Sequence, residues 1–346
     1  MNKLSLLIEN LKTQCAFIIE NPINLKYFTG SNIDTGILVI KQNEVLFFTD
    51  SRYIESAKKQ ILEPIKVVLL NNKKAQLRQC LFDVENIYIE THYQTVFGAK
   101  LYNYKDDALL DNLINGLRAV KSPYEIDCIK SAQKLTDAAF SHILNHIKEG
   151  VSERQIALEL EFFMRKNGAE GVSFDIIAVS GKNSSLPHGI PTDKPISKGD
   201  FLTIDMGCKV NGYCSDMTRT VAVGYVTDEM RRVYDIVSKA QQTALDSIKA
   251  GAVCKNVDAA ARDIITARGY GDCFGHSTGH GVGLYIHEEP RLSSLSDTVL
   301  KEGMVVTVEP GIYIEDKFGV RIEDMVVVTE NGCENLTGSD KSLIIL

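Results

Sequence analysis

The chain has 346 residues, of which 44% are hydrophobic and 24% charged, and its formal net charge is −7. This length predicts two domains, each with enough apolar material for a core. No run of Lys or Arg stands out, which argues against a nucleic-acid partner. No segment reaches the roughly 18 apolar residues of a membrane span. Residues 1–14 have the pattern of a short amphipathic helix and not of a signal peptide, so we expect a cytoplasmic protein with no membrane partner.

The eight cysteines are scattered along the chain, and none forms a C-x-x-C pair. This distribution favours buried free thiols in a reducing compartment. Cys208 and Cys214 flank a predicted turn, so a disulfide between them is within reach, although nothing requires one.

Residues 15–110 alternate short apolar runs with helical patterns, which predicts an α/β layer. One helix is expected to end at Gly30, and another to begin near Ser51 with Asp50 or Ser51 as its cap. Arg52 and Tyr53 are better explained by surface roles than by catalysis. The expected strands are CAFIIE, TGILVI, EVLFFTD, PIKVVLL and NIYIE. We place the first domain at residues 1–119.

The second domain, residues 120–346, begins with a capping-box pattern at Ser122, followed by a long amphipathic helix that we expect to close at Gly150. A second helix is predicted from a cap at Ser152, and an apolar strand at residues 174–179. Two more helical patterns and a strand-rich tail follow. Helices followed by antiparallel strands predict an α+β domain.

Residues 201–223 predict a β-hairpin, because two apolar runs flank Asn211-Gly212, the dipeptide that favours a type I′ turn. With that turn, Asp205 faces Thr218, and Asp216 lies on the same face as a diagonal neighbour of Asp205, about 7–8 Å away. Two buried carboxylates need a cation between them. The alternatives are two exposed turn carboxylates, or one carboxylate paired with Arg219.

Further along the chain, more candidate ligands stand in apolar or glycine-rich surroundings. His280 lies between glycines, which permit close approach of the backbone to a ligand. Glu309 precedes Pro310, which should end its strand, and Glu323 lies inside the apparent strand VRIEDMVVV. Each has a structural explanation, such as pairing of Glu323 with Arg321. Together, four carboxylates and one imidazole suit a pair of divalent ions, with Mn²⁺ first and Fe, Co or Zn as alternatives.

The segments IDMG, CSDMTRT, HSTGHGVGLYIHEEP, VVTVEPGIYI and GVRIEDMVVV resemble, in order and spacing, those of the "pita-bread" metallopeptidases. NPINLKYFTG and TDSRYIESA resemble the creatinase/aminopeptidase P amino-terminal domain. The resemblance therefore implies a creatinase-like, ribonuclease H-like α/β domain followed by a pita-bread catalytic domain. It excludes the methionine aminopeptidases, which lack the first domain.

The resemblance also implies roles for individual residues. Asp205 would chelate one ion, His280 and Glu309 the other, and Asp216 and Glu323 would bridge both. A water or hydroxide between the ions would attack the carbonyl before a proline, with Glu309 as general base. Five further residues would assist: His188 and His287 as donors to the substrate or intermediate, His276 on the proline side, Arg321 orienting Asp205, and Tyr313 as a weaker candidate.

Within this family, the resemblance favours an Xaa-Pro aminopeptidase, which acts on peptides with proline at the second position. The first alternative is a prolidase, which splits Xaa-Pro dipeptides. A non-catalytic binding module is disfavoured because all five ligand types are present. The resemblance further implies a homodimer or larger homo-oligomer with two metal ions per chain.

Overall fold

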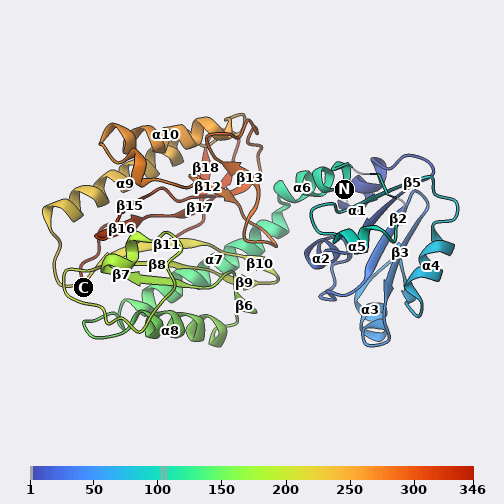
Figure 1. Ribbon diagram of the computed structural model, residues 1–346, viewed down its shortest axis with the longest axis horizontal. Coiled ribbons are helices and arrows are strands. Elements are labelled where there is room, and N and C mark those ends of the chain that lie inside the picture. The colour runs from blue at the N-terminus through green and yellow to red at the C-terminus, as the bar shows by residue number, and fades with distance from the viewer. Residues whose placement is uncertain (1–2, 103, 106) are drawn as a thin grey trace. The chain divides into compact units, whose positions relative to one another are not determined.

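The computed structural model describes residues 3–102, 104–105 and 107–346. The chain divides into two compact units between Leu117 and Arg118 (Figure 1). Helix α6 (Leu109–Ala119) crosses this division.

The first unit is built on a five-stranded mixed sheet with the order β4-β3-β2-β1-β5. The β1–β5 and β3–β4 pairs are parallel, and the others are antiparallel. Its apolar side chains form cores around the sheet, as the α/β pattern predicts. The elements are α1 (Lys3–Glu9), β1 (Cys15–Ile19), α2 (Pro22–Thr29), β2 (Ile37–Lys41), β3 (Glu44–Thr49), α3 (Ile54–Gln60), β4 (Ile65–Leu69), α4 (Lys73–Cys80), β5 (Asn86–Ile89) and α5 (Val96–Ala99).

One helix boundary of the first unit was predicted wrongly. Helix α3 begins at Ile54, and its N-cap residue Tyr53 makes no side-chain capping bond. Asp50 instead accepts the backbone N–H of Arg52 at 2.8 Å and pairs with its guanidinium. The carboxylate therefore stabilises a turn before the helix, which competes with capping. Gly30 ends α2 in the left-handed conformation, as predicted.

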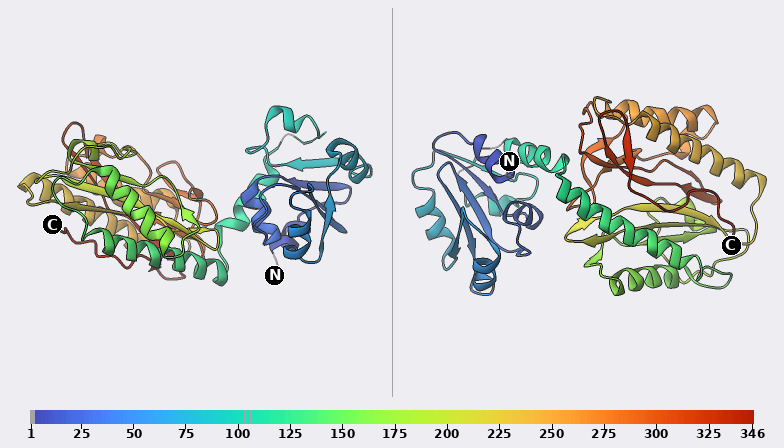
Figure 2. Two further views of the ribbon diagram at one scale, coloured as in Figure 1. Left: turned by 90° about the horizontal axis from the view of Figure 1, so that it is seen from below. Right: turned by 180° about the vertical axis from the view of Figure 1, so that it is seen from behind.

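In the second unit, helices α7 and α8 lie on one side of the strands and α9 and α10 on the other (Figures 1 and 2). Each helix pair closes its own apolar core against the strands. The helices are α7 (Pro123–Ile143), α8 (Glu153–Lys166), α9 (Asp228–Ser247) and α10 (Cys254–Ala267). Ser122 and Ser152 both form capping boxes. Helix α7 ends at Ile143 and not near Gly150, because residues 144–150 turn away.

The strands of the second unit form short antiparallel sheets, with the orders β10-β9-β6, β11-β8-β7, β13-β12-β14-β17-β18 and β15-β16. The apolar strand predicted at residues 174–179 is β7, which begins three residues later, at Ile177. The strands are β6 (Gly171–Val172), β7 (Ile177–Ser180), β8 (Phe201–Met206), β9 (Cys208–Val210), β10 (Tyr213–Cys214), β11 (Met217–Ala222), β12 (Gly279–Gly281), β13 (Glu288–Leu292), β14 (Val305–Val308), β15 (Gly311–Ile314), β16 (Phe318–Arg321), β17 (Asp324–Val328) and β18 (Cys333–Asn335).

The hairpin has the predicted register. Asp205 pairs with Thr218 across β8 and β11, and Val210 with Tyr213 beside the turn. Asn211 and Gly212 have φ values of 52° and 81°, the positive values that a type I′ turn requires. Cys208 and Cys214 are buried free thiols, so no disulfide joins the two halves.

Arg219 does not neutralise either aspartate of the hairpin. It is 1% exposed and pairs through Nη2 with Asp324 Oδ1 at 2.8 Å. Its other donors reach backbone carbonyls, including those of Thr218 and Ser339. The structure therefore excludes the pairing of Arg219 with Asp205 or Asp216. Among the helices in the described part of the chain, none is long and apolar enough to cross a membrane.

We predict that Arg219→Ala lowers the free energy of unfolding by about 3–5 kcal/mol, because it removes the main partner of a buried carboxylate. The matched control is Arg154→Ala, which removes an exposed arginine paired with Asp193. The control should leave the unfolding midpoint unchanged within error. Chemical denaturation checks both variants, and an equal effect of the two would contradict the assignment.

Candidate active site

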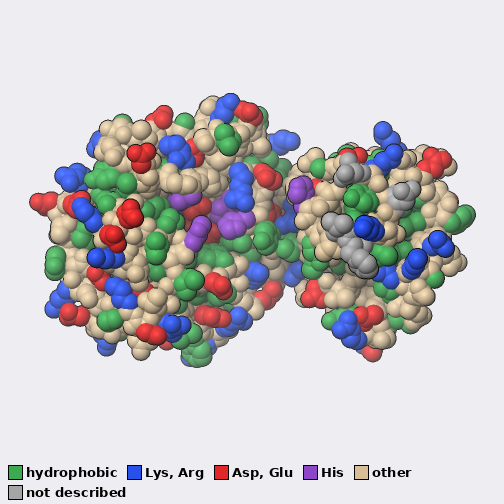
Figure 3. Space-filling view, in the orientation of Figure 1, with side chains coloured by type: hydrophobic (Ala, Val, Ile, Leu, Met, Phe, Trp, Pro, Cys, Tyr) green, Lys and Arg blue, Asp and Glu red, His purple; other side chains and the backbone are tan. Residues whose placement is uncertain are grey.

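A cavity of about 690 Å³ in the second unit brings most of the predicted site residues together. In the space-filling view, histidine side chains gather in a hollow on this unit (Figure 3). Nine of the ten predicted residues line the cavity: His188, Asp205, Asp216, His276, His280, His287, Glu309, Arg321 and Glu323. Tyr313 does not line the wall and is buried behind it.

Three of the four carboxylates lie where strands are interrupted. Asp216 falls between β10 and β11, Glu309 between β14 and β15, and Glu323 between β16 and β17. The expectation that Glu323 lies inside a strand was therefore wrong, whereas Pro310 does mark a strand end. At the break, the N–H of Glu323 donates to the carbonyl of Thr218 at 3.1 Å, which joins two sheets. The breaks aim the carboxylates into the space between the sheets.

His280 lies on β12, next to a shift in strand register. Its Nδ1 lies 3.1 Å from the carbonyl oxygen of Gly281, so Nδ1–H donates there and Nε2 is left as an acceptor. Nε2 lies 3.5 Å from Asp216 Oδ2 and 3.4 Å from Glu309 Oε1. A donated Nδ1 proton and a bare Nε2 are the arrangement of metal-ligating histidines.

The glycines around His280 make room for the backbone of adjacent strands. A Cβ on Gly279 would lie 1.9 Å from the carbonyl oxygen of Thr307, and one on Gly281 would lie 2.2 Å from that of Glu289. Only glycine permits this approach of neighbouring backbones. The close approach that the structure shows is therefore to adjacent strands, and the predicted approach to a ligand stays a prediction.

Arg321 connects the carboxylates without neutralising all of them. Its Nη2 pairs with Asp205 Oδ2 at 2.7 Å, and its Nε donates to Thr218 Oγ1 at 3.0 Å. The Thr218 hydroxyl in turn donates to Glu323 Oε2 at 2.8 Å. Arg321 therefore pairs with Asp205 and reaches Glu323 only through a hydroxyl. The alternative of a direct Arg321–Glu323 pair is excluded.

His276 and Tyr313 form a second chain from the same arginine. Arg321 Nη1 donates to Tyr313 Oη at 2.7 Å, and Tyr313 Oη lies 2.8 Å from His276 Nε2. His276 Nδ1 lies 2.9 Å from the carbonyl of Ser277. Both ring nitrogens of His276 are thus occupied. It can therefore contact a substrate by packing of its ring, but not by a hydrogen bond. Among the described residues, the side chains of His188 and His287 form no hydrogen bond, so both can donate to a ligand.

Burial and mutual repulsion oppose ionisation of the acids when no cation is bound. Burial, then the charges of Glu323 and Asp205, raise the pKa of Asp216 well above its usual value. Burial likewise raises the pKa of Glu323 well above its usual value and that of Glu309 to about 8. Burial lowers the pKa of His280 to about 3, so its ring is neutral. Such groups keep their protons until a cation replaces them.

These residues fit a divalent-metal centre. Asp205 Oδ1 and Glu323 Oε1 are buried and have no hydrogen-bond partner in the described part of the chain. Asp216, His280 and Glu323 each offer a ligand atom, and these atoms lie within 4.8 Å of one another. Buried carboxylate oxygens without donors are rare unless they bind an ion. Four carboxylates and one imidazole provide an oxygen-rich ligand set.

Arg291, on β13, lines the cavity but was not among the site residues predicted from the sequence. Its side chain is exposed and makes no hydrogen bond or ion pair with the described residues. Its charge lowers the pKa of His280, His287 and Glu309, so it lies within electrostatic reach of the acids. The signal in the sequence was its place four residues after His287, on the strand next to that of His280.

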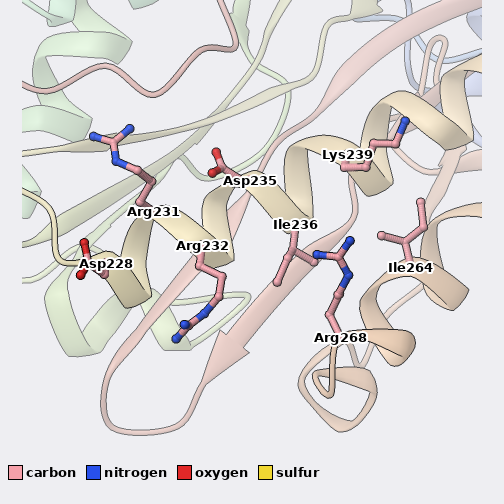
Figure 4. Close-up of a pocket in the computed structure, with 8 residues that line it drawn as sticks. All are labelled: Asp228, Arg231, Arg232, Asp235, Ile236, Lys239, Ile264 and Arg268. Carbon is pink, nitrogen blue, oxygen red and sulfur yellow. The ribbon is translucent and has the colours of Figure 1, made fainter.

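A second hollow, between α9 and α10, lacks these features. It has a volume of about 470 Å³ and combines four basic side chains with two aspartates and no histidine (Figure 4). The lining residues are Asp228, Arg231, Arg232, Asp235, Ile236, Lys239, Ile264 and Arg268. None of the predicted site residues lies there.

Residues 127–330 match metallopeptidase family M24. The chain belongs to this family. Residues 3–120 match the creatinase/prolidase N-terminal domain. The Xaa-Pro dipeptidase of Pyrococcus furiosus is 41% identical over 330 residues, which cover 94% of each chain. These matches confirm the expected metallopeptidase family with its creatinase-type N-terminal domain.

Two solved structures are similar over almost the whole chain. The Xaa-Pro dipeptidase from Bacillus anthracis has a TM-score of 0.92 and 41% identity, covering 99% of this chain and 98% of that one. The X-Pro aminopeptidase from Thermotoga maritima has a TM-score of 0.90 and 38% identity, covering 99% and 100%. The pita-bread fold predicted from the sequence is therefore confirmed.

The raised pKa values predict how the stability of the metal-free protein depends on pH. A carboxyl whose folded pKa exceeds its unfolded pKa loses its stabilising contribution as the pH rises toward the folded value. Between about pH 6.5 and 8, above the range where His280 and His276 oppose the trend, the unfolding midpoint should therefore fall. Saturating Mn²⁺ should abolish this fall, because cations replace the protons.

The matched variant is Glu323→Gln, which removes one acid of the cluster and should show a smaller fall in midpoint over the same pH range. Thermal unfolding after treatment with a chelator provides the measurement. A midpoint that is flat or rises with pH in the metal-free wild-type protein would show that the acids are not protonated in the folded state.

Proposed function

We propose that this chain is a metal-dependent Xaa-Pro dipeptidase, which hydrolyses the bond before the proline of a dipeptide. Relatives named as Xaa-Pro dipeptidase or prolidase recur at 37–41% identity. This reverses the order of the two candidates that the sequence favoured. The choice depends on Arg291, whose positive charge lies near the candidate metal ligands and has no hydrogen-bond or ion-pair partner among the described residues.

A dipeptide brings its own carboxylate to the site, one residue from the bond that breaks. That carboxylate needs a cation near the acids, which would otherwise repel it. Two arginines line the cavity, and Arg321 is fully engaged with Asp205, Thr218 and Tyr313. The guanidinium of Arg291, the other cavity arginine, has no hydrogen-bond or ion-pair partner among the described residues. Its planar group can donate two parallel hydrogen bonds to a carboxylate.

In this proposal Asp205, Asp216, His280, Glu309 and Glu323 hold two divalent ions, with Mn²⁺ first and Fe, Co or Zn as alternatives. Such ions, when bound, lower the pKa of water and polarise a carbonyl group. The Arg321 pair fixes the orientation of Asp205. The donated Nδ1–H of His280 directs its Nε2 toward the ligand set.

The remaining steps use groups that the chain itself supplies. Glu309 accepts the proton of the attacking water and returns it to the departing proline nitrogen. His287 and His188, whose rings are free to donate, stabilise the negative charge that develops on the carbonyl oxygen. The ring of His287 lies edge-on to that of His280, with centroids 4.5 Å apart, so it sits beside the ligand set. His276 provides a ring surface for the proline side.

The second candidate is an Xaa-Pro aminopeptidase, supported by the likeness to the Thermotoga maritima enzyme. Both activities share the chemistry at the metals and differ in what lies beyond the proline. The proposal also includes a cytoplasmic location and a homodimer or larger assembly, which were expected from the sequence.

With Mn²⁺ added, we predict that kcat/KM for an Ala-Pro dipeptide exceeds that for Ala-Pro-Ala by at least about tenfold, since one charged hydrogen bond contributes about 1.5–3 kcal/mol. Steady-state assays of product release measure both substrates. The reverse preference would identify an aminopeptidase. Hydrolysis of neither substrate by metal-replete protein would favour a binding module.

We further predict that Arg291→Met raises KM for Ala-Pro by about 10–100-fold, because the variant loses the partner of the substrate carboxylate. Hydrolysis of Ala-Pro-amide, which has no carboxylate, should change little. Arg268→Met, an exposed arginine of the α9–α10 hollow, is the control and should behave as wild type. An equal loss with both substrates would show that Arg291 does not recognise the carboxylate.

A further inference from the structure

A second cluster of metal-ligand side chains lies outside the cavity, where the end of α7 meets α8. His142 belongs to the last turn of α7, His146 to the turn that follows, and Glu159 to α8. Each offers a ligand atom, and these atoms lie within 4.8 Å of one another. None of the three lines the active-site cavity.

The hydrogen bonds of this cluster leave one imidazole nitrogen without a proton. His146 Nδ1 lies 3.1 Å from the carbonyl of His142, so in the neutral ring Nδ1 carries the proton and Nε2 is a bare acceptor. That Nε2 faces Glu159 Oε1 at 3.9 Å, which is too long for a hydrogen bond. In this neutral tautomer two acceptor atoms face each other, an arrangement that a bound cation would bridge.

His142 is the third candidate ligand, and its ring packs against two neighbouring rings. Its Nε2 lies 2.7 Å from the same Glu159 Oε1. Its ring stacks on Phe163 with centroids 4.3 Å apart and lies 4.3 Å from the ring of His146. A tetrahedral ion with bonds of about 2.0–2.1 Å needs ligand atoms about 3.3 Å apart, and the two distances to Glu159 bracket this value.

We propose that His142, His146 and Glu159 bind one borderline transition-metal ion of the Zn²⁺ class, separate from the ions of the active site. Two imidazoles and one carboxylate suit Zn²⁺ and not Mg²⁺ or Ca²⁺. His146 and Glu159 have side chains 44% and 35% exposed, so the site is reachable and its fourth position is open to water. The ion would fasten the end of α7 to α8.

The test is the zinc content of the Mn²⁺-loaded chain after dialysis against Zn²⁺, measured by mass spectrometry of the metals. The wild-type chain should hold one zinc equivalent more than His146→Ala and Glu159→Gln. Glu161→Gln is the matched control, because Glu161 lies on the same helix and pairs with Arg165. Zinc that exchanges into the active site is common to all four proteins, so the difference isolates the new site.

A second measurement guards against misfolding of the variants. Zn²⁺ should raise the unfolding temperature of the wild-type chain and of Glu161→Gln more than that of the other two variants. Dipeptide hydrolysis should be unchanged in all three variants, so failure of this proposal is distinguishable from failure of the proposed function. Equal zinc content in the wild type and in either His146→Ala or Glu159→Gln overturns the assignment.

Discussion

The central constraint on the second unit is an excess of buried carboxylates over positively charged partners in one cavity. Four carboxylates converge there. Among the described residues, Arg321 is the arginine that hydrogen-bonds to one of them, and it pairs directly with Asp205. Burial of the remaining acids is unfavourable unless they hold protons or cations. Two observations follow from this excess of negative charge. The pKa of Asp216 is raised, and one oxygen each of Asp205 and Glu323 is buried without a hydrogen-bond partner among the described residues. The backbone of the surrounding sheets brings these acids together.

The convergence of the acids follows from how the strands are interrupted. A continuous strand alternates its side chains across two faces and would turn every second one away from the site. Breaks at Asp216, Glu309 and Glu323 free these residues from the ladder, while backbone bonds such as Glu323 N–H to Thr218 tie the ends together. Next to Glu323 in the chain, Asp324 forms a fully buried ion pair with Arg219. The acids are thus positioned by hydrogen-bonded backbone where the sheets meet.

Much of this was predictable, because the signals were local. The Asn211-Gly212 turn sets the hairpin register, and the capping boxes at Ser122 and Ser152 set two helix starts. The candidate metal ligands stand out because carboxylates are rare in apolar runs. The pairing of Arg321 with Asp205 was expected only through the family resemblance. What the sequence could not provide were two other facts about distant partners: that both ring nitrogens of His276 are occupied, one of them by Tyr313, and that the side chain of Arg291 has no hydrogen-bond or ion-pair partner among the described residues. The break before Asp324 was missed because VRIEDMVVV has no glycine or proline to mark it.

The most direct test of the account is where metal ions bind. Crystals of the Mn²⁺-loaded protein should be measured at the manganese absorption edge, and the anomalous difference density located. Two peaks are expected inside the cavity, within bonding distance of Asp205, Asp216, His280, Glu309 and Glu323. An absence of peaks among these residues in an enzyme that still cleaves Xaa-Pro bonds would contradict it.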